Sequence, residues 1–226
     1  MALILAYLHG KINSSLSNQM RQTKAMSPGY SIRWWERHAY SPPDINPIDF
    51  LRKRIEWRYA KGIPSVYPSL VILGDSKIRL KGLGNHLKKR KIPKFSLLFT
   101  SPPYNDLTHY HYDQWLRLWM LGGPDHPAGK GDYNKGRFES KSKYTSLLNS
   151  TFSEAAKWMK QNAVVYVRTD ARAFTFQSTV NALKKAFPKK EFEFIARPYS
   201  KKTQTSLFGD DEQKPGEIDI IMRPAN

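Results

Sequence analysis

Residues 95–104 of the chain, FSLLFTSPPY, place a run of strand-forming residues directly before two prolines. Aromatic and β-branched residues favour an extended backbone, so a strand is predicted from Phe95 onward. Proline has no N–H to donate to a β-ladder, and the strand is therefore predicted to end at Thr100 or Ser101. Beyond that end, the fixed φ angles of the two prolines make the backbone rigid and so restrict where the aromatic ring of Tyr104 can lie. A corner this rigid favours a functional site over an ordinary turn.

Apolar strands and helices alternate on both sides of this stretch. The pattern predicts an α/β sheet with flanking helices, finished by an antiparallel pair of strands at the C-terminus. We interpret the chain as one domain, with an irregular N-terminal extension over residues 1–48 and an α/β core over residues 49–226. Besides 95–101, strands are predicted at 69–76, 163–170, 192–200 and 216–224, and helices at 49–62, 112–123, 144–162 and 175–187.

Cap residues and apolar faces define the predicted helices. Asp49 is the expected N-terminal cap of the helix at 49–62, and Gly62 is expected to end it. The segment 78–93 contains Gly82 and Gly84 and is predicted to be a turn and a short helix that cross between two strands. The expected apolar faces are Leu51, Ile55 and Tyr59 in the first helix; Trp115, Leu118 and Trp119 in the second, which Gly122 and Gly123 close; and Leu148, Phe152, Ala155 and Met159 in the third.

The composition indicates which classes of partner the chain can bind. The chain has 37 Lys and Arg against 19 Asp and Glu, a formal net charge of +18, which favours a polyanion such as nucleic acid, with simple solubility as the alternative. There is no cysteine, so disulfides and cysteine-ligated metals are excluded. The apolar N-terminal run lacks a basic flank and is too short to span a bilayer. We therefore expect a cytoplasmic protein with no metal and no membrane contact.

Functional residues of open α/β sheets gather at the carboxyl ends of the strands, and three candidates fall there. They are Asp75 after the strand at 69–74, the tetrad Ser101–Tyr104, and the segment 168–170 with Arg168 and Asp170. Each has a structural alternative, because Asp75 can simply cap the next helix and Arg168 and Asp170 can form a local surface pair. The tetrad is the hardest to explain as a plain connection.

The stretch TSPPY after an apolar strand resembles the catalytic motif of the amino-methyltransferases that modify DNA. The segments VILGDS (71–76), SNQMRQTKAMSPGYSIRWW (17–35) and RTDARAFT (168–175) also look like parts of this group. The resemblance implies a partial Rossmann-like methyltransferase sheet, S-adenosylmethionine as methyl donor and double-stranded DNA as substrate. A serine in the first position is typical of enzymes that methylate cytosine N4, with adenine N6 as the alternative. The resemblance also implies that the protein takes part in restriction and modification of DNA.

The resemblance assigns roles to residues of the corner. Ser101 and the carbonyl of Pro102 would accept both N–H groups of the target amino group, and Pro103 would stiffen the acceptors. Tyr104 would stack on a base that has swung out of the duplex. At the edge of the pocket for the base and the cofactor we place Asp75, Thr100, Asn105, Arg168 and Asp170.

One expected feature is missing. The resembling enzymes bind S-adenosylmethionine with a Phe-x-Gly-x-Gly loop between a strand and a helix, and none of the 226 residues form that motif. Three interpretations are open: a split enzyme whose complementary subunit carries the glycine loop, a degenerate fragment, or cofactor binding by the N-terminal segment in an unfamiliar way. Alternatives to DNA methylation are a non-catalytic nucleic-acid-binding module and an RNA methyltransferase.

Basic residues are the candidates for contacts with DNA phosphates, although such residues also occur as solvated surface. One group is Lys88, Lys89, Arg90 and Lys91, and a second lies in a predicted loop with Lys130, Lys135, Arg137, Lys141 and Lys143. The stretch QTSLF, Gln204 to Phe208, resembles a sliding-clamp peptide. A loop that closes over the target base is the interpretation we prefer for it.

Overall fold

A computed structural model gives the fold and describes residues 4, 7, 16, 28–41, 44–63, 69–105, 110–125, 140–198 and 216–225. The chain divides into two compact units, one of Met1–Leu70 with His109–Tyr133 and one of Val71–Thr108 with Asn134–Asn226. The helix predicted to open the α/β core at residue 49 thus belongs to the first unit. No helix within the described residues is long and apolar enough to cross a membrane.

The first unit contains helices α2 (Pro28–Arg37), α3 (Pro47–Tyr59) and α5 (Tyr110–Met120). The prediction that Asp49 caps α3 is wrong: the Asn46 side chain accepts hydrogen bonds from the backbone N–H groups of Ile48 at 2.9 Å and Asp49 at 3.3 Å. Pro47 explains the earlier start, because proline suits the first helical position, where no N–H partner is needed. Gly62 follows the helix with φ +95°, a conformation that favours glycine.

Helix α5 lies where the apolar spacing predicted a helix. Trp115 is buried and its ring stacks on that of Trp119 with centroids 6.3 Å apart. Gly122 has φ +93° and ends the element. Leu118 and Trp119 share this face with Trp115 but are partly exposed.

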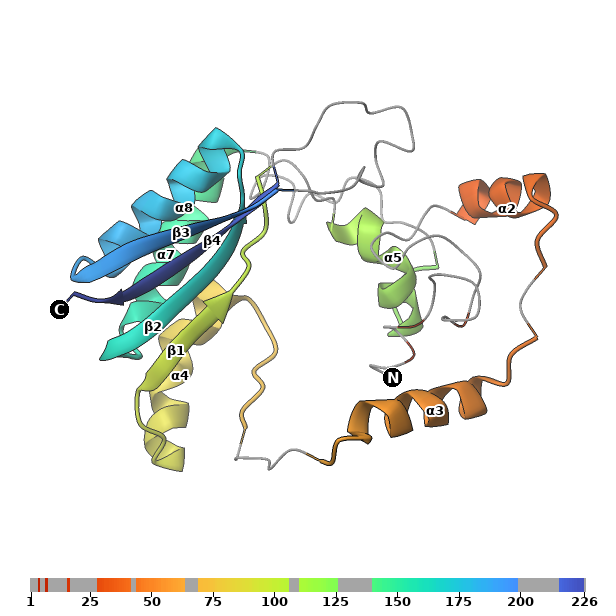
Figure 1. Ribbon diagram of the computed structural model, residues 1–226, viewed down its shortest axis with the longest axis horizontal. Coiled ribbons are helices and arrows are strands. Elements are labelled where there is room, and N and C mark those ends of the chain that lie inside the picture. The colour runs from red at the N-terminus through yellow and green to blue at the C-terminus, as the bar shows by residue number, and fades with distance from the viewer. Residues whose placement is uncertain are drawn as a thin grey trace. The chain divides into compact units, whose positions relative to one another are not determined.

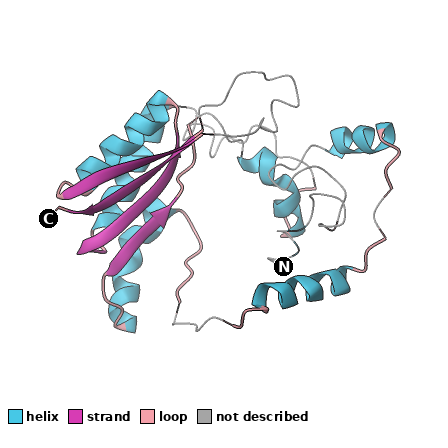
Figure 2. Cartoon of the chain, viewed as in Figure 1, coloured by secondary structure: helices cyan, strands magenta, loops and turns pink. Residues whose placement is uncertain are grey.

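The second unit is built on a four-stranded sheet in the order β1-β2-β4-β3 (Figures 1 and 2). Its strands are β1 (Phe95–Thr100), β2 (Met159–Asp170), β3 (Lys190–Arg197) and β4 (Glu217–Pro224). β1 and β2 are parallel, whereas β4 runs antiparallel to both β2 and β3. The α/β class and the C-terminal antiparallel pair predicted from the sequence are confirmed.

Helices α4 (Ser76–Arg90), α7 (Lys141–Ala156) and α8 (Ala173–Ala186) lie behind the strands in Figure 1. Period-2 alternation turns every second strand residue toward them, on what we call the covered face. Its core joins residues of β2 and β4 to the predicted stripe of α7. Burying a large aliphatic side chain contributes about 1.5–3 kcal/mol, so this face dominates the stability. The core residues are Tyr144, Leu148, Phe152, Met159, Ala163, Val165, Val167, Val180, Ala182, Leu183, Phe187, Ile220 and Met222.

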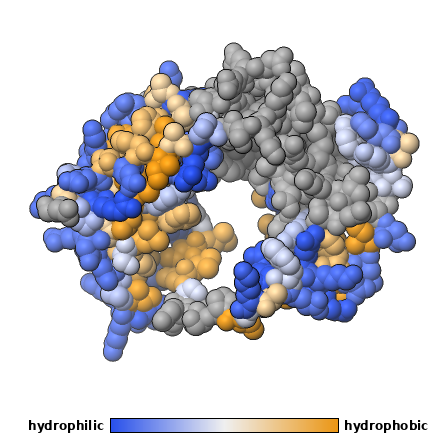
Figure 3. All heavy atoms as spheres, viewed as in Figure 1, coloured by the Kyte–Doolittle hydropathy of each residue, from blue (hydrophilic) through white to orange (hydrophobic). Residues whose placement is uncertain are grey.

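The opposite face of the sheet, the open face, is turned to the viewer in Figure 3, where hydrophobic residues show in orange over the strands. β1 contributes Leu97, which is 55% exposed, and Phe99, which is 72% exposed. The Phe99 ring stacks on that of Tyr166 from β2 at 5.0 Å. No described helix of this unit packs against these residues.

Segment 78–93 differs from its prediction. It belongs to one continuous helix, α4, rather than to a turn and a short helix. Gly84 has a packing role within this helix. A Cβ there would lie 2.4 Å from the ring of Trp158, so only glycine lets the indole approach α4 this closely. The Trp158 indole N–H in turn donates to the Leu80 carbonyl at 2.9 Å. The glycine that suggested a break is therefore a packing site.

The predicted strand at 69–76 is not formed in the described residues. Residues 71–73 precede α4 without pairing to another strand, and Val71 and Leu73 are 93% and 91% exposed. An apolar run forms a strand only when its backbone hydrogen-bonds to a neighbouring strand, and residues 71–73 do not pair with the open edge of β1. Two further assignments shift: Met159 begins β2 instead of ending a helix, and Lys141 and Lys143 lie in α7 instead of a loop.

Candidate nucleobase-binding site

The tetrad 101–104 lies directly beyond the carboxyl end of β1, as the prolines predicted. Ser101 is exposed, whereas Pro102, Pro103 and Tyr104 are half-buried. Asn105 closes the segment and is buried. The corner thus offers the Ser101 hydroxyl to solvent while its far end is fixed in the protein.

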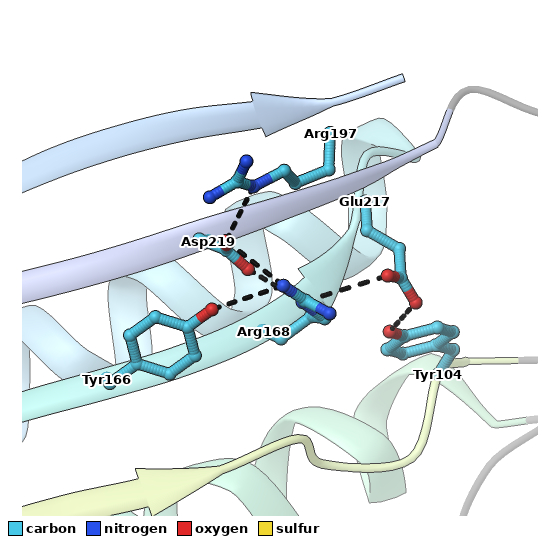
Figure 4. A network of polar contacts seen from close by, with 6 residues as sticks. All are labelled: Tyr104, Tyr166, Arg168, Arg197, Glu217 and Asp219. Atoms are coloured by element: carbon cyan, nitrogen blue, oxygen red, sulfur yellow. Dashed lines mark hydrogen bonds and ion pairs between the residues drawn. The ribbon is translucent and has the colours of Figure 1, made fainter. Parts of the chain in front are cut away.

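Tyr104 is fixed by strand β4. Its phenol donates a hydrogen bond to Glu217 Oε1 at 2.7 Å, across 113 residues of sequence (Figure 4). Glu217 is the first residue of β4 and pairs with Asp170 on one side and Arg197 on the other. The anchor of the tyrosine is therefore part of a strand that has a neighbour on both sides.

An ion-pair network continues from Glu217 along the open face (Figure 4). Arg168 on β2 donates to Asp219 through Nε at 2.7 Å and Nη2 at 3.1 Å, and Nη2 also donates to the Tyr166 hydroxyl at 3.2 Å. Arg197 on β3 donates through Nε to the same carboxylate at 2.9 Å. The Nε atom of Arg168 lies 3.7 Å from Glu217 Oε2. Three strands thus meet at Asp219.

The network changes the acidity of its members. Hydrogen bonds from Arg168 hold the pKa of Asp219 well below its ordinary value, even though burial acts in the opposite direction. The same hydrogen bond raises the pKa of Arg168 further above the ordinary arginine value. Asp219 is fully buried. Asp219 and Arg168 both stay charged because each is paired with the other.

A second polar group fixes the residue after the tetrad. The Asp170 carboxylate accepts hydrogen bonds from Arg172 at the backbone N–H, 3.0 Å, and at Nε, 2.8 Å. The Arg172 Nη2 group donates to the backbone carbonyl of Asn105. Asp170 ends β2 and Arg172 precedes α8, so this group ties the end of the tetrad to the start of that helix.

The structure separates two residues that the sequence suggested as a local pair. Arg168 binds Asp219, and Asp170 binds Arg172, so the interpretation of Arg168 and Asp170 as partners of each other is wrong. Both nevertheless belong to groups that contact the tetrad segment. Thr100 is placed on the covered face by its register with Val167. Its role at the pocket edge stays a prediction.

Asp75 has the structural role given above as its alternative, the cap of the next helix. Its side chain accepts a hydrogen bond from the Lys77 N–H at 3.0 Å and caps α4. The preceding Gly74 has φ +139°, and the Arg79 side chain lies where a Cβ would point. A contact of Asp75 with a base or a cofactor stays a prediction.

The basic cluster lies at the other end of β1. Lys88, Lys89 and Arg90 form the last turn of α4, and Lys91 follows it with φ +52°. They precede β1, whereas the tetrad follows it, and six strand residues span roughly 20 Å. Positive charge at a helix C-terminus also has a structural benefit. Lys130, Lys135, Arg137 and the QTSLF stretch lie outside the described residues.

Sequence reasoning missed the residues that hold the site together. Tyr166, Arg172, Arg197, Glu217 and Asp219 were not among the candidates. A signal existed for two of them, since β4 reads Glu-Ile-Asp-Ile-Ile, with two carboxylates at alternate positions of an otherwise apolar strand. A buried acid in such a strand requires a cationic partner, but the sequence does not say which.

The described residues do not fit a loop for S-adenosylmethionine. Gly82 and Gly84, which are separated by one residue, lie inside α4 and not in a loop between a strand and a helix, and Gly84 packs on Trp158. The described part of the chain also holds no group of three or more histidine, aspartate or glutamate side chains that could bind a metal ion.

Neither protein-family models nor curated proteins match the chain. Among solved structures, it resembles a protein from Streptococcus mutans that has been assigned as a SAM-dependent methyltransferase. The two share 12% sequence identity with a TM-score of 0.30. The match covers 62% of this chain and 29% of that protein, so the chain spans less than a third of its length. A likeness this distant carries no argument about the activity of this chain.

Proposed function

We propose that this chain carries the target-base site of an S-adenosylmethionine-dependent methyltransferase that acts on an amino group of a DNA base. Cytosine N4 is the first choice and adenine N6 the alternative. The observation that carries the proposal is the geometry of the corner. An exposed serine follows a strand end, and a tyrosine three residues later is held by the carboxylate of Glu217, the first residue of an inner strand of the sheet.

The chemistry accounts for the residue types. An exocyclic amino group is a poor nucleophile because its lone pair is delocalised into the ring. The Ser101 hydroxyl oxygen and the Pro102 carbonyl would accept its two N–H groups and favour the pyramidal, more reactive nitrogen. The proline rings keep these acceptors in place before the base arrives, which removes reorganisation from the barrier. The nitrogen would attack the methyl carbon of the sulfonium donor, so that a C–N bond forms while the C–S bond breaks and a thioether leaves, and the nitrogen would lose one proton to water.

Tyr104 would capture the base. An amino group inside a duplex cannot be reached by these acceptors, so the base must swing out and find a new stacking partner. Stacking on an aromatic side chain contributes about 1–3 kcal/mol per base. The net charge of +18 supports binding of the polyanionic backbone, with an affinity that falls as salt rises.

We also propose that a unit outside these 226 residues supplies the cofactor loop. Ligands of doubly wound sheets bind in the crevice where the strand order reverses. β1 is one of the two edge strands of the described sheet, and its exposed Leu97 and Phe99 suit a surface that a further element covers. A strand added parallel to β1 would place its own carboxyl end next to the tetrad. The complementary subunit expected from the sequence would have this form.

The test is transfer of a labelled methyl group. The chain is incubated with methyl-labelled S-adenosylmethionine and DNA, alone and with a protein that carries the strand–glycine loop–helix unit, and the DNA is hydrolysed to nucleosides. We expect label on N4-methylcytosine when both proteins are present. Label in neither mixture would leave a nucleic-acid-binding module. Label found only on RNA would identify an RNA methyltransferase.

Ser101→Ala is the decisive variant in this assay. Loss of one pre-positioned polar contact should reduce the rate about a hundredfold. Because Ser101 is exposed, thermal unfolding should stay unchanged. Ser96→Ala removes another exposed serine of the same segment and should methylate like the original chain. Equal rates for both variants would contradict the role of the tetrad.

A further inference from the structure

The hydroxyl of Tyr104 is occupied by the protein itself. It donates to Glu217 Oε1 at 2.7 Å, while the tyrosine ring is half-buried. Tyr104 belongs to a segment outside the strands, whereas Glu217 is paired on both sides, with Asp170 and with Arg197. The rigid partner in this contact is therefore the glutamate, and the partner that needs fixing is the tyrosine.

The neighbouring arginines fix the orientation of the Glu217 carboxylate. Two guanidinium groups, those of Arg168 and Arg197, face the single buried carboxylate of Asp219. Glu217 supplies the second negative charge, with Oε2 at 3.7 Å from Arg168 Nε. Its two oxygens thus have separate tasks: one faces the arginine and the other accepts from the phenol. A hydroxyl that donates to a carboxylate forms a charge-assisted bond, which is stronger than a neutral one.

We infer that Glu217 is a positioning residue for the tetrad and orients the Tyr104 ring to receive a nucleobase. The inference rests on the proposed function, because it assigns the ring to base stacking. It adds that the phenol hydroxyl serves the orientation of the ring and makes no contact with the substrate. The first residue of the C-terminal strand thereby sets the geometry of a site 113 residues earlier.

The experiment measures binding of a fluorescein-labelled oligodeoxycytidylate by anisotropy, at fixed salt, for the full chain and its variants. Tyr104→Ala should weaken binding about 5- to 150-fold, the range of one lost base–aromatic stack. Glu217→Ala and Tyr104→Phe should each weaken it severalfold. The double variant Glu217→Ala/Tyr104→Phe should be no weaker than either single one, because both remove the same bond. Glu217→Gln should restore most of the affinity, since an amide oxygen also accepts.

A matched control separates orientation from charge and stability. Glu193→Ala removes a carboxylate on β3 that pairs with Arg223, which changes the net charge equally and should leave the affinity unchanged. All variants are compared at a temperature where circular dichroism shows them folded. A merely structural glutamate would lower the unfolding temperature without rescue of binding by glutamine and without dependence on the Tyr104 hydroxyl.

Two results would overturn the inference: Glu217→Ala that binds like the original chain, or losses for Glu217→Ala and Tyr104→Phe that add in the double variant. Failure of the proposed function looks different. If no methyl transfer occurs while the binding cycle is non-additive, the positioning role stands and the methyltransferase assignment falls. If Ser101→Ala abolishes transfer while the cycle is additive, only the positioning role falls.

Discussion

Asp219 and Ile220 are neighbours in β4, and both are fully buried, yet they lie on opposite faces of the sheet. Ile220 lies in the apolar core of the covered face. Asp219 lies on the open face, beneath the guanidinium groups of Arg168 and Arg197. The two side chains are thus equally buried for different reasons. Ile220 is buried by hydrophobic packing, and Asp219 by ion pairs with arginines of the two neighbouring strands.

The difference teaches what each face depends on. An apolar face needs residues of suitable size at alternate positions, and many sequences satisfy it. A buried carboxylate needs particular partners at particular atoms, because an unpaired buried charge is costly. The open face is therefore the more specific of the two, and it is the face that contacts the tetrad through Glu217.

Truncation of Ile220 or of Asp219 should give the largest loss in the free energy of unfolding. Ile220→Ala should cost about 2–5 kcal/mol, through lost burial and a cavity. Asp219→Ala should cost about 3 kcal/mol, at the low end for a broken buried pair because its arginine partners are partly exposed. Urea unfolding at neutral pH measures both. A loss below about 1 kcal/mol for Asp219→Ala would mean that solvent screens the network.

Acid should distinguish the two faces. The pKa of Asp219 is lowered in the folded chain, so its stabilising effect is complete above the unfolded value, about 3.9, and fades as pH falls below it. The difference in unfolding free energy between the original chain and Asp219→Asn should therefore shrink below about pH 4. The cost of Ile220→Ala should not change with pH. A constant cost for both would contradict the assigned pKa direction.

The smallest effect is expected on β1, where neighbours again lie on opposite faces. Leu98 packs against the core, and Leu98→Ala should cost about 2 kcal/mol or more. Phe99 is 72% exposed, so Phe99→Ala should cost at most about 1 kcal/mol, the value of its stack on Tyr166. Thermal unfolding of the two variants gives the comparison. Equal losses would show that a further element covers Phe99 in the isolated chain.

The sequence predicted those parts of the fold that follow from local patterns. Apolar and β-branched runs located β2, β3 and β4, and the stripe of Leu148, Phe152 and Ala155 located α7. It failed where a distant partner decides. Residues 71–73 look like a strand but do not pair with a neighbouring strand, and Gly84 looks like a break but accommodates Trp158.

The candidate site divides in the same way. Proline chemistry alone placed the tetrad at the end of β1, because two prolines cannot continue a ladder. The residues that fix the tetrad come from β2, β3 and β4, up to 113 positions away. Nothing in the local pattern joins Tyr104 to Glu217, since that contact depends on the insertion of β4 between β2 and β3.

Photo-crosslinking tests most directly whether the corner receives a nucleobase. An oligonucleotide that contains 5-iodocytosine is irradiated in complex with the chain, and mass spectrometry locates the joined residue. We expect the crosslink at Tyr104, and its loss in Tyr104→Ala. Crosslinks confined to other aromatic residues, such as Phe99 and Tyr166, would contradict the assignment of the tetrad as the base-binding site.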